Sequence, residues 1–246
     1  MDATAHRPSK AEGRKLVNSA TQVGIEEGYE RWAPAYDHTI NPVLALEERH
    51  IMPLLGNIEE RAVLDLACGT GRWLQKLVAQ GAGVGVGIDS SAAMLCVANV
   101  KPALRGRLTR ADCLQLPFRG ASFDFAICSF ALSHILQLKD AVAELARLMK
   151  PNADVFVTDL HAEAYAQGWR TSFRDKREVL EIEALARTVV EVVEAFQAAG
   201  FECVEHTPLY FGEAEKPLFE RTGKAHLFSA ACRIPAILFC HFRTPA

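Results

Sequence analysis

The sequence predicts an α/β protein whose core is a doubly wound, mostly parallel sheet. Short apolar runs alternate with segments of helical periodicity from residue 62 to residue 160, as is typical of βα units with helices on both faces of a sheet. A glycine turn directly follows the first apolar run. The chain has 246 residues, of which 50% are hydrophobic and 23% charged, enough for one sizeable core. We therefore predict a single domain over residues 1–246.

The N-terminal segments are expected to flank the sheet rather than enter it. Residues 1–20 are polar and predict a flexible arm, and residues 21–56 predict N-terminal cap helices. The aromatic run 28–37 is interrupted by Pro34 and suits a helix that ends in a turn. Pro42 suits the first turn of a second helix.

Residues 57–160 form the predicted cofactor-binding core, in which strands and helices alternate. Strands are expected at 62–66, 84–89, 107–111, 123–130 and 154–159, with helices at 71–80, 91–99 and 140–149. The carboxyl ends of parallel strands lie at one edge of such a sheet, and ligands of α/β proteins bind at that edge.

The C-terminal third changes character after residue 160. Residues 162–187 fit no clean period and predict an insertion over the active-site edge, with room for a short strand. Residues 188–246 predict a C-terminal helix and strands. Thr188-Val189-Val190-Glu191 is a capping box that begins the helix, and Gly200 ends it. The two final strands, at 201–205 and 236–242, are separated by a polar loop without a helix, so we expect an antiparallel pair at the end of the sheet.

The bulk composition disfavours several classes of partner. A net charge of −3 gives no basic field for nucleic acid or an anionic membrane, and no apolar stretch is long enough to span a bilayer. The first 13 residues lack the apolar segment of a secretory signal. Seven scattered cysteines form no C-x-x-C pair, and no histidine pair has zinc-site spacing. We expect a cytoplasmic protein with reduced thiols and without a metal; the sequence leaves its oligomeric state open.

A nucleoside site is indicated by the run Val63–Trp73 and by Gly87-Ile88-Asp89-Ser90 after it. Gly69 and Gly71 allow a sharp turn between a strand and a helix N-terminus, and Asp89 ends the next strand eighteen residues past Gly71. A dinucleotide fingerprint would place a third glycine where Leu74 stands. Asp65, four residues before Gly69, would repel a pyrophosphate but favour an ammonium group. These features disfavour a nicotinamide cofactor.

The chain resembles the class I S-adenosylmethionine-dependent methyltransferases, within the small-molecule branch that includes the ubiquinone/menaquinone-biosynthesis methyltransferases. The resemblance covers roughly residues 28–160 and implies a Rossmann-like fold, with S-adenosyl-L-methionine as cofactor and S-adenosyl-L-homocysteine as product. It rests on four runs: Tyr29-x-x-Trp32-Ala33-x-x-Tyr36-Asp37, Val63-Leu64-Asp65-Leu66-Ala67-Cys68-Gly69-Thr70-Gly71, Gly87-Ile88-Asp89-Ser90-Ser91-x-x-Met94-Leu95, and Ala111-Asp112-x-x-x-Leu116-Pro117-Phe118-x-x-x-Ser122-Phe123-Asp124. Ala67 stands where many members carry a first glycine.

The resemblance also implies a set of roles for the residues of these runs. Asp89 would accept hydrogen bonds from both ribose hydroxyls, and Asp112 would accept the adenine amino proton. Carbonyl groups near Ala67 and Ser129 would receive the methionine ammonium. The residues expected to contact the cofactor are Tyr29, Trp32, Tyr36, Asp65, Ala67, Cys68, Gly69, Gly71, Asp89, Ser90, Met94, Asp112, Cys113, Ser129 and Phe130.

Structural roles compete with these assignments. Asp65 and Asp89 can cap the helices that follow them, and Asp112 can be an ordinary loop carboxylate. The three aromatic residues of the first run have helical spacing and can serve packing alone; in the cofactor interpretation they close over its amino-acid end. They are Tyr29, Trp32 and Tyr36.

Two histidines are candidate bases, because His134 and His161 follow sheet strands on the expected catalytic side. Packing behind the strand is the alternative for His134, and capping of a loop is the alternative for His161. Base N-methylation of nucleic acids is disfavoured, because Ser129 is not followed by an Asn- or Asp-Pro-Pro-aromatic run.

The acceptor pocket is expected between residues 29–40 and 165–183. In the second segment Tyr165, Trp169 and Phe173 recur at fours and would share one face if helical, although core packing of the insertion is an alternative. With Phe130 these residues suggest a small, apolar or aromatic acceptor, and the resemblance implies methyl transfer to it by in-line displacement. A catalytically inactive S-adenosylmethionine-binding sensor or partner protein is the alternative function.

Overall fold

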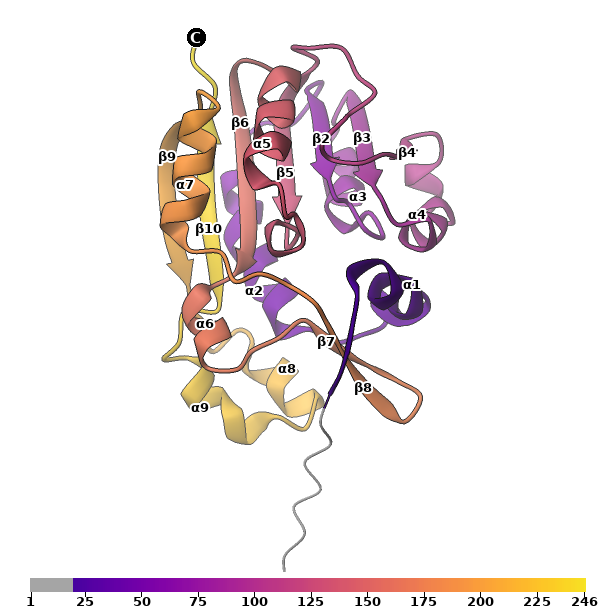
Figure 1. Ribbon diagram of the computed structural model, residues 1–246, viewed down its shortest axis with the longest axis vertical. Helices are drawn as coiled ribbons and strands as arrows, with labels where there is room; N and C mark the ends of the chain where they lie inside the picture. Colours follow the sequence, from indigo (N-terminus) through magenta and orange to yellow (C-terminus); the bar gives the residue numbers. More distant parts are fainter. Residues whose placement is uncertain (1–19) are drawn as a thin grey trace, which may run out of the picture.

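The computed structural model describes residues 20–246, so the predicted arm lies almost wholly outside the described residues. Its main feature is a seven-stranded sheet in the order β4-β3-β2-β5-β6-β10-β9 (Figure 1). The strands are β2 (Ala62–Leu66), β3 (Val84–Asp89), β4 (Leu108–Arg110), β5 (Phe123–Ser129), β6 (Met149–Leu160), β9 (Glu202–Leu209) and β10 (Ile237–Arg243). In this order, the neighbouring strands β4, β3, β2, β5 and β6 are all parallel, and β10 is antiparallel to both β6 and β9. The predicted fold class, including the antiparallel C-terminal pair, is confirmed.

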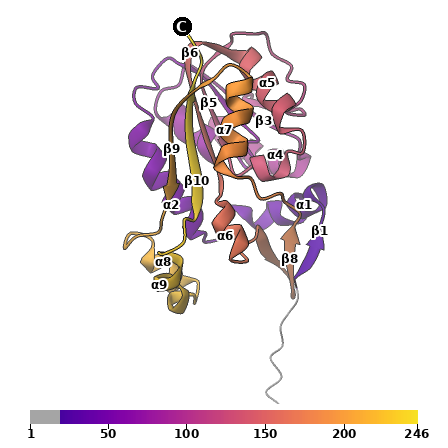
Figure 2. The ribbon, with the colours of Figure 1, turned by 60° about the vertical axis from the view of Figure 1, so that its left-hand side comes forward.

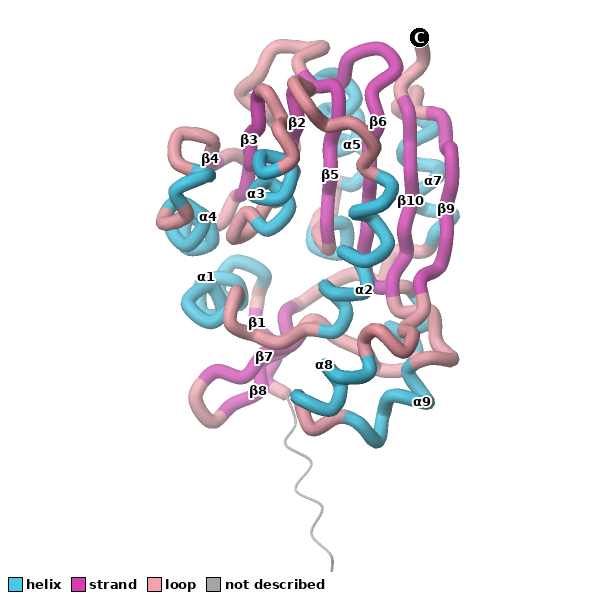
Figure 3. The backbone as a smooth tube through the Cα atoms, turned by 180° about the vertical axis from the view of Figure 1, so that it is seen from behind, coloured by secondary structure: helices cyan, strands magenta, loops and turns pink. Residues whose placement is uncertain are grey.

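Helices cover both faces of this sheet, and the strand residues alternate between the two sides. Leu64 and Ala126 pack in one apolar cluster with α5 and α7, whereas Val63 and Phe125 pack in another with α2 and α3. Figures 1 and 3 show these layers from opposite sides. The helices are α2 (Pro42–Ile51), α3 (Arg72–Ala79), α4 (Ala92–Asn99), α5 (Leu138–Leu148) and α7 (Val189–Ala198). Burial on both faces explains why the central strands are continuous apolar runs in the sequence.

A second, three-stranded sheet packs against the first helix and was not predicted. It has the order β1-β8-β7, from β1 (Thr21–Val23), β7 (Ser172–Asp175) and β8 (Glu178–Ile182). Strand β1 pairs in parallel with β8, and β7 and β8 form an antiparallel hairpin. Beside it runs α1 (Ile25–Tyr36), with Trp32 stacked on Phe173 at 4.9 Å between ring centroids. Figures 1 and 2 place this unit beyond the carboxyl ends of β2 and β3.

In the C-terminal third, Tyr165 and Phe173 are buried, as the core-packing alternative predicted, and no helical face forms, because α6 (Ala162–Ala166) ends before Gly168, whose φ is +86°. The expectation that no helix lies between the last two strands is wrong. The polar loop between the last strands contains α8 (Lys216–Arg221) and is followed by α9 (Phe228–Ala231). Phe219 of α8 is buried there, so the segment joins the core despite its polar sequence.

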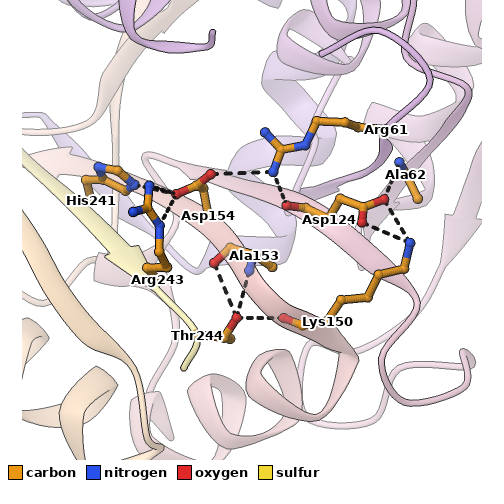
Figure 4. A network of polar contacts seen from close by, with 9 residues as sticks. All are labelled: Arg61, Ala62, Asp124, Lys150, Ala153, Asp154, His241, Arg243 and Thr244. Atoms are coloured by element: carbon orange, nitrogen blue, oxygen red, sulfur yellow. Dashed lines mark hydrogen bonds and ion pairs between the residues drawn. The ribbon is translucent and has the colours of Figure 1, made fainter. Parts of the chain in front are cut away.

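A polar network joins the strands at the end of the sheet where β2 and β5 begin (Figure 4). Asp124 accepts hydrogen bonds from Lys150 Nζ at 2.8 and 2.9 Å and from the Ala62 amide at 2.9 Å. Asp154 of β6 accepts from Arg243 of β10, and its Oδ1 lies 2.9 Å from His241 Nε2. The network therefore connects β2, β5, β6 and β10 across the sheet.

Asp154→Asn is expected to lower the free energy of unfolding by about 1–3 kcal/mol. Burial tends to raise the pKa of Asp154, but hydrogen bonds from His241 and Arg243 lower it below its ordinary value. A carboxylate with a lowered folded pKa stabilises the protein above its unfolded pKa of about 3.9 and loses that contribution as the pH falls through the folded value. Urea unfolding at pH 7 and pH 3 measures the effect.

The matched control for this prediction is Glu220→Gln, which alters an exposed carboxylate of α8. The stability difference between wild type and Asp154→Asn should shrink at pH 3. An Asp154→Asn protein that is as stable as wild type at pH 7 would contradict a stabilising role for the network.

Candidate cofactor site

A cavity of about 470 Å³ lies at the carboxyl ends of β2, β3 and β5, beside α1. Thirteen of the fifteen residues predicted to contact the cofactor line it; Trp32 and Gly71 do not. Those that do are Tyr29, Tyr36, Asp65, Ala67, Cys68, Gly69, Asp89, Ser90, Met94, Asp112, Cys113, Ser129 and Phe130. The structure therefore brings residues from four separate sequence runs into one site.

The turn after β2 has the backbone geometry expected of a ligand-binding loop. Ala67, Gly69 and Gly71 all have positive φ values, of 56°, 55° and 78°. A Cβ atom at position 71 would lie 2.3 Å from Leu104 Cδ1, so glycine is required there by both backbone and space. Gly71 thus shapes the loop from outside the cavity, and α3 begins directly after it.

Asp65 holds the start of α3. Its Oδ2 atom accepts a hydrogen bond from the Leu74 amide at 2.8 Å, and the side chain is buried. Burial raises the pKa of Asp65 to about 7, although the Leu74 amide and Arg72 oppose the shift. The helix-capping role considered for this residue is thus present in the structure, at a position that also lines the cavity.

Asp89 is oriented by backbone amides at the tip of β3. Its Oδ2 accepts from the Gly69 amide at 2.7 Å, and its Oδ1 accepts from the Ser91 amide at 2.8 Å. Burial raises the pKa of this carboxyl, and the amides of Ser91, Gly69 and Ser90 partly offset the shift. A carboxylate oxygen can accept a second hydrogen bond, so both oxygens can receive ribose hydroxyls in this fixed orientation.

The region of Asp112 suits a flat heterocyclic ring. Asp112 Oδ1 accepts from the Leu114 amide at 2.9 Å in a tight turn, and Met94 is buried close to the same cavity. Burial, with Asp112 nearby, raises the pKa of the Cys113 thiol to about 11, so the thiol is neutral at physiological pH. Met94 and Cys113 therefore present neutral sulfur-containing surfaces to a ligand.

A buried carboxylate that the sequence analysis missed supports one wall of the cavity. Glu47 of α2 is fully buried and accepts hydrogen bonds from Ser129 Oγ at 2.7 Å and from Trp73 Nε1 at 3.1 Å. Arg72 and Thr158 also donate to it. Arg72 itself lines the cavity, and its guanidinium also donates to Ser129 Oγ at 3.2 Å.

A second polar cluster ties the glycine loop to the end of α1. Thr70 Oγ1 donates to Asp37 Oδ1 at 2.6 Å, and Lys101 Nζ lies 2.7 Å from both Asp37 Oδ2 and the Thr70 carbonyl oxygen. Asp37 belongs to the first sequence run, but we predicted no function for it. The contacts show that it holds the helix against the loop.

His134 lies at the same cavity and contacts Tyr29. Tyr29 Oη is 2.9 Å from His134 Nε2, and His134 Nδ1 is 3.0 Å from the Glu183 carbonyl oxygen. Burial lowers the pKa of His134, against the opposing effect of the Glu183 carbonyl. The imidazole is therefore neutral at physiological pH, as a general base must be.

Three of the predicted groups lie outside this cavity. Trp32 does not line the cavity, because its ring is buried between Tyr36 and Phe173 in the core of the small unit. His161 also lies outside it, where its Nδ1 accepts from the Glu163 amide at 3.2 Å and caps α6. The side chains of residues 165–183 do not line the cavity either. Its wall instead includes Ile25, Glu26, Ile135, Leu136 and Gln137.

The described part of the chain contains neither a cluster of metal ligands nor a membrane-spanning helix. Between residues 20 and 246 there is no group of three or more His, Cys, Asp or Glu side chains placed to hold a metal ion. Over the same residues, no helix combines the length and apolar character required to cross a bilayer.

Comparison with known proteins gives a consistent result. Residues 63–152 match the methyltransferase domain family. A 2-phytyl-1,4-naphtoquinone methyltransferase of Synechocystis sp. is 30% identical to this chain, over 59% of this chain and 66% of the relative. A demethylmenaquinone methyltransferase of Lactiplantibacillus plantarum is 34% identical, over 49% of this chain and 56% of the relative. The structure of an S-adenosylmethionine-dependent methyltransferase from Mesorhizobium loti aligns with a TM-score of 0.66 and 20% identity, covering 82% of this chain and 100% of that one.

These matches support the predicted class. Residues 63–152 match a methyltransferase domain, and the fold is that of the solved S-adenosylmethionine-dependent methyltransferase, with the Rossmann-like sheet order described above. Within that class the chain resembles the menaquinone-biosynthesis methyltransferases, as the motifs predicted, and S-adenosyl-L-methionine is the cofactor of this class. The matched regions span 56–66% of the length of the two curated relatives.

Proposed function

We propose that the protein transfers the methyl group of S-adenosyl-L-methionine to a small, apolar aromatic acceptor, and that a reduced quinone ring is the acceptor class. The observation that carries this proposal is the orientation of Asp89 by the Gly69 and Ser91 amides, in one cavity with Asp112 and Met94. This arrangement can bind a ribose and an adenine side by side. The two curated relatives act on naphthoquinone-type molecules by their names, which supports the acceptor class.

The shape of the cavity supports in-line displacement. Ile25, Phe130, Ile135 and Leu136 add apolar surface to the cavity that also contains the cofactor residues. Apolar walls can hold a ring with its nucleophilic atom toward the methyl group, and such orientation contributes up to about 7–11 kcal/mol to catalysis. We also propose that residues 1–246 belong to one domain. The protein is proposed to be cytoplasmic and to bind no nucleic acid.

Calorimetry and a transfer assay test the proposal. The protein should bind S-adenosyl-L-homocysteine in preference to NAD, and it should transfer labelled methyl groups to 2-phytyl-1,4-naphthohydroquinone kept reduced. Preferential binding of NAD would overturn the cofactor assignment. Binding of S-adenosyl-L-homocysteine without transfer to any member of a panel of small aromatic acceptors would favour a cofactor sensor instead.

Asp89→Ala is expected to weaken binding of S-adenosyl-L-homocysteine by roughly 3 kcal/mol, which is more than a hundredfold in Kd. The variant loses both charge-assisted ribose contacts and also the acceptor that orients the Gly69 amide. Titration calorimetry measures the affinity, and circular dichroism checks that the fold persists. Asp140→Ala, on the exposed side of α5, is the control. Wild-type affinity in Asp89→Ala would show that the ribose lies elsewhere.

A further inference from the structure

Tyr29 and His134 form one hydrogen-bonded unit although they are 105 residues apart in the sequence. Tyr29 comes from α1, and His134 comes from the turn that follows β5. Their rings meet edge to face with centroids 5.3 Å apart, and both side chains line the cofactor cavity. We predict Tyr29 as a cofactor contact and His134 as a candidate base from the sequence, and this contact makes them a pair.

The second contact of His134 fixes the direction of this hydrogen bond. The Glu183 carbonyl oxygen, 3.0 Å from Nδ1, can only accept, so Nδ1 carries the proton of the neutral ring. Nε2 then has the free electron pair, and the Tyr29 hydroxyl must donate to it. The Nε2 electron pair is thus already engaged by the phenol, whereas the lone pairs of Tyr29 Oη remain to accept a proton.

We infer that Tyr29 is a catalytic residue, whose hydroxyl accepts the proton of the methyl acceptor and passes its own proton to His134. This inference rests on the proposed function. The acceptor O–H bond breaks and a new O–H bond forms at Tyr29 Oη, while the original Tyr29 proton moves to Nε2. The resulting imidazolium is stabilised by the Glu183 carbonyl.

The remaining bonds balance without an oxidant or a reductant. The electron pair freed on the acceptor, at oxygen or through the ring at carbon, forms the bond to the methyl carbon. The methyl–sulfur bond breaks and its electron pair stays on sulfur, which gives S-adenosyl-L-homocysteine. For a carbon acceptor, the ring C–H proton leaves as aromaticity is restored, and the phenolate oxygen of the product takes back one proton. One proton is released to solvent in total when His134 returns to its neutral form.

The surroundings keep both members of the pair neutral before reaction. Burial is the main cause that raises the pKa of Tyr29, followed by Tyr36, Asp159, Asp89 and Tyr165. Burial likewise lowers the pKa of His134. Trp32 restricts the position of the Tyr29 phenol, because the two rings stack with centroids 6.2 Å apart. This contact gives the buried Trp32 a positioning role in place of its predicted contact with the cofactor.

Tyr29→Phe tests the inference because it removes the hydroxyl and keeps the ring. With 2-phytyl-1,4-naphthohydroquinone as acceptor, we expect kcat to fall at least tenfold and the Kd of S-adenosyl-L-homocysteine to stay within twofold. The acid limb of the kcat–pH profile should move to higher pH, because His134 loses the donor that favours its neutral form. Tyr210→Phe, at an exposed position, is the matched control. A loss of affinity with unchanged kcat and pH profile would overturn the inference and leave Tyr29 as a cofactor contact.

A measurement without turnover separates this inference from the proposed function. In ¹⁵N-histidine spectra of the complex with S-adenosyl-L-homocysteine, His134 should be the Nδ1–H tautomer, and its pKa should rise in Tyr29→Phe. The His134 signals are assigned by their loss in His134→Gln. An Nε2–H tautomer, or a His134 pKa unaffected by Tyr29→Phe, would overturn the pair even if methyl transfer occurs. The expected spectra together with no transfer to the hydroquinone would instead contradict the proposed acceptor class.

Discussion

His134→Ala is expected to slow methyl transfer to 2-phytyl-1,4-naphthohydroquinone by about 10²- to 10⁴-fold in kcat, the usual contribution of a positioned general base. The variant removes the atom that takes the proton, and Tyr29 then has no partner at 2.9 Å to which it can pass one. The affinity for S-adenosyl-L-homocysteine should be retained, because His134 takes no part in the hydrogen bonds that orient Asp89 and Asp112. Single-turnover kinetics and calorimetry measure the two quantities.

The pH dependence of the wild-type enzyme follows from the same residue. His134 must be neutral to accept a proton, and burial lowers its pKa from the ordinary value of 6.5. Activity should therefore persist below pH 6.5 and fall only as the pH drops through the lowered value. His206→Ala, at an exposed position of β9, is the control for loss of a histidine. Unchanged kcat in His134→Ala would remove it as the base.

Glu47→Ala is expected to destabilise the protein by about 3–5 kcal/mol, which is the usual cost of removing one partner of a buried ion pair and leaving the other charge buried. The carboxylate is fully buried and is the acceptor for Arg72, Trp73 and two hydroxyl groups. Without it, the Arg72 guanidinium retains its charge in a site with little solvent, since its side chain is only 21% exposed. Urea unfolding measures the loss.

The neighbouring residue provides a matched control for Glu47. Glu48 lies on the same helix and pairs with Lys76 at 2.7 Å, but its side chain is 40% exposed. Glu48→Ala should therefore cost no more than about 1 kcal/mol, as is usual for solvent-exposed ion pairs. Equal losses in the two variants would show that burial of the Glu47 cluster does not govern its contribution.

The sequence predicted the central sheet well because its signals are local. Strands 62–66 and 84–89 have the predicted bounds, since strands that are largely buried on both faces are rich in apolar residues. The helix after Thr188 begins with the predicted capping box, in which the Thr188 and Glu191 side chains satisfy each other's backbone amides. Each of these signals lies within a few consecutive residues.

The errors occurred where distant segments meet. Strand β1 pairs with β8, whose residues follow more than 150 positions later, and no local pattern predicts that pairing. Trp32 shares its helical spacing with Tyr29 and Tyr36, which do line the cavity. The hairpin β7–β8, however, brings Phe173 against the Trp32 ring. His161 follows a strand at the correct edge, yet a nearby helix start uses its Nδ1 atom. The side chains were identified from the sequence, but their neighbours were not.

The sheet and the glycine turn could be predicted from the amino-acid sequence, because they depend on apolar periodicity and on backbone conformations that only a few residues adopt readily. The family resemblance implied the residues of the cofactor cavity. The packed fold was needed to show which side chains face that cavity and which of them touch. Glu47, Asp37 and the Tyr29–His134 contact depend on atoms more than 20 residues apart in the chain. Hydrogen bonds act over about 3 Å, so such partners are specified only when the whole chain has packed.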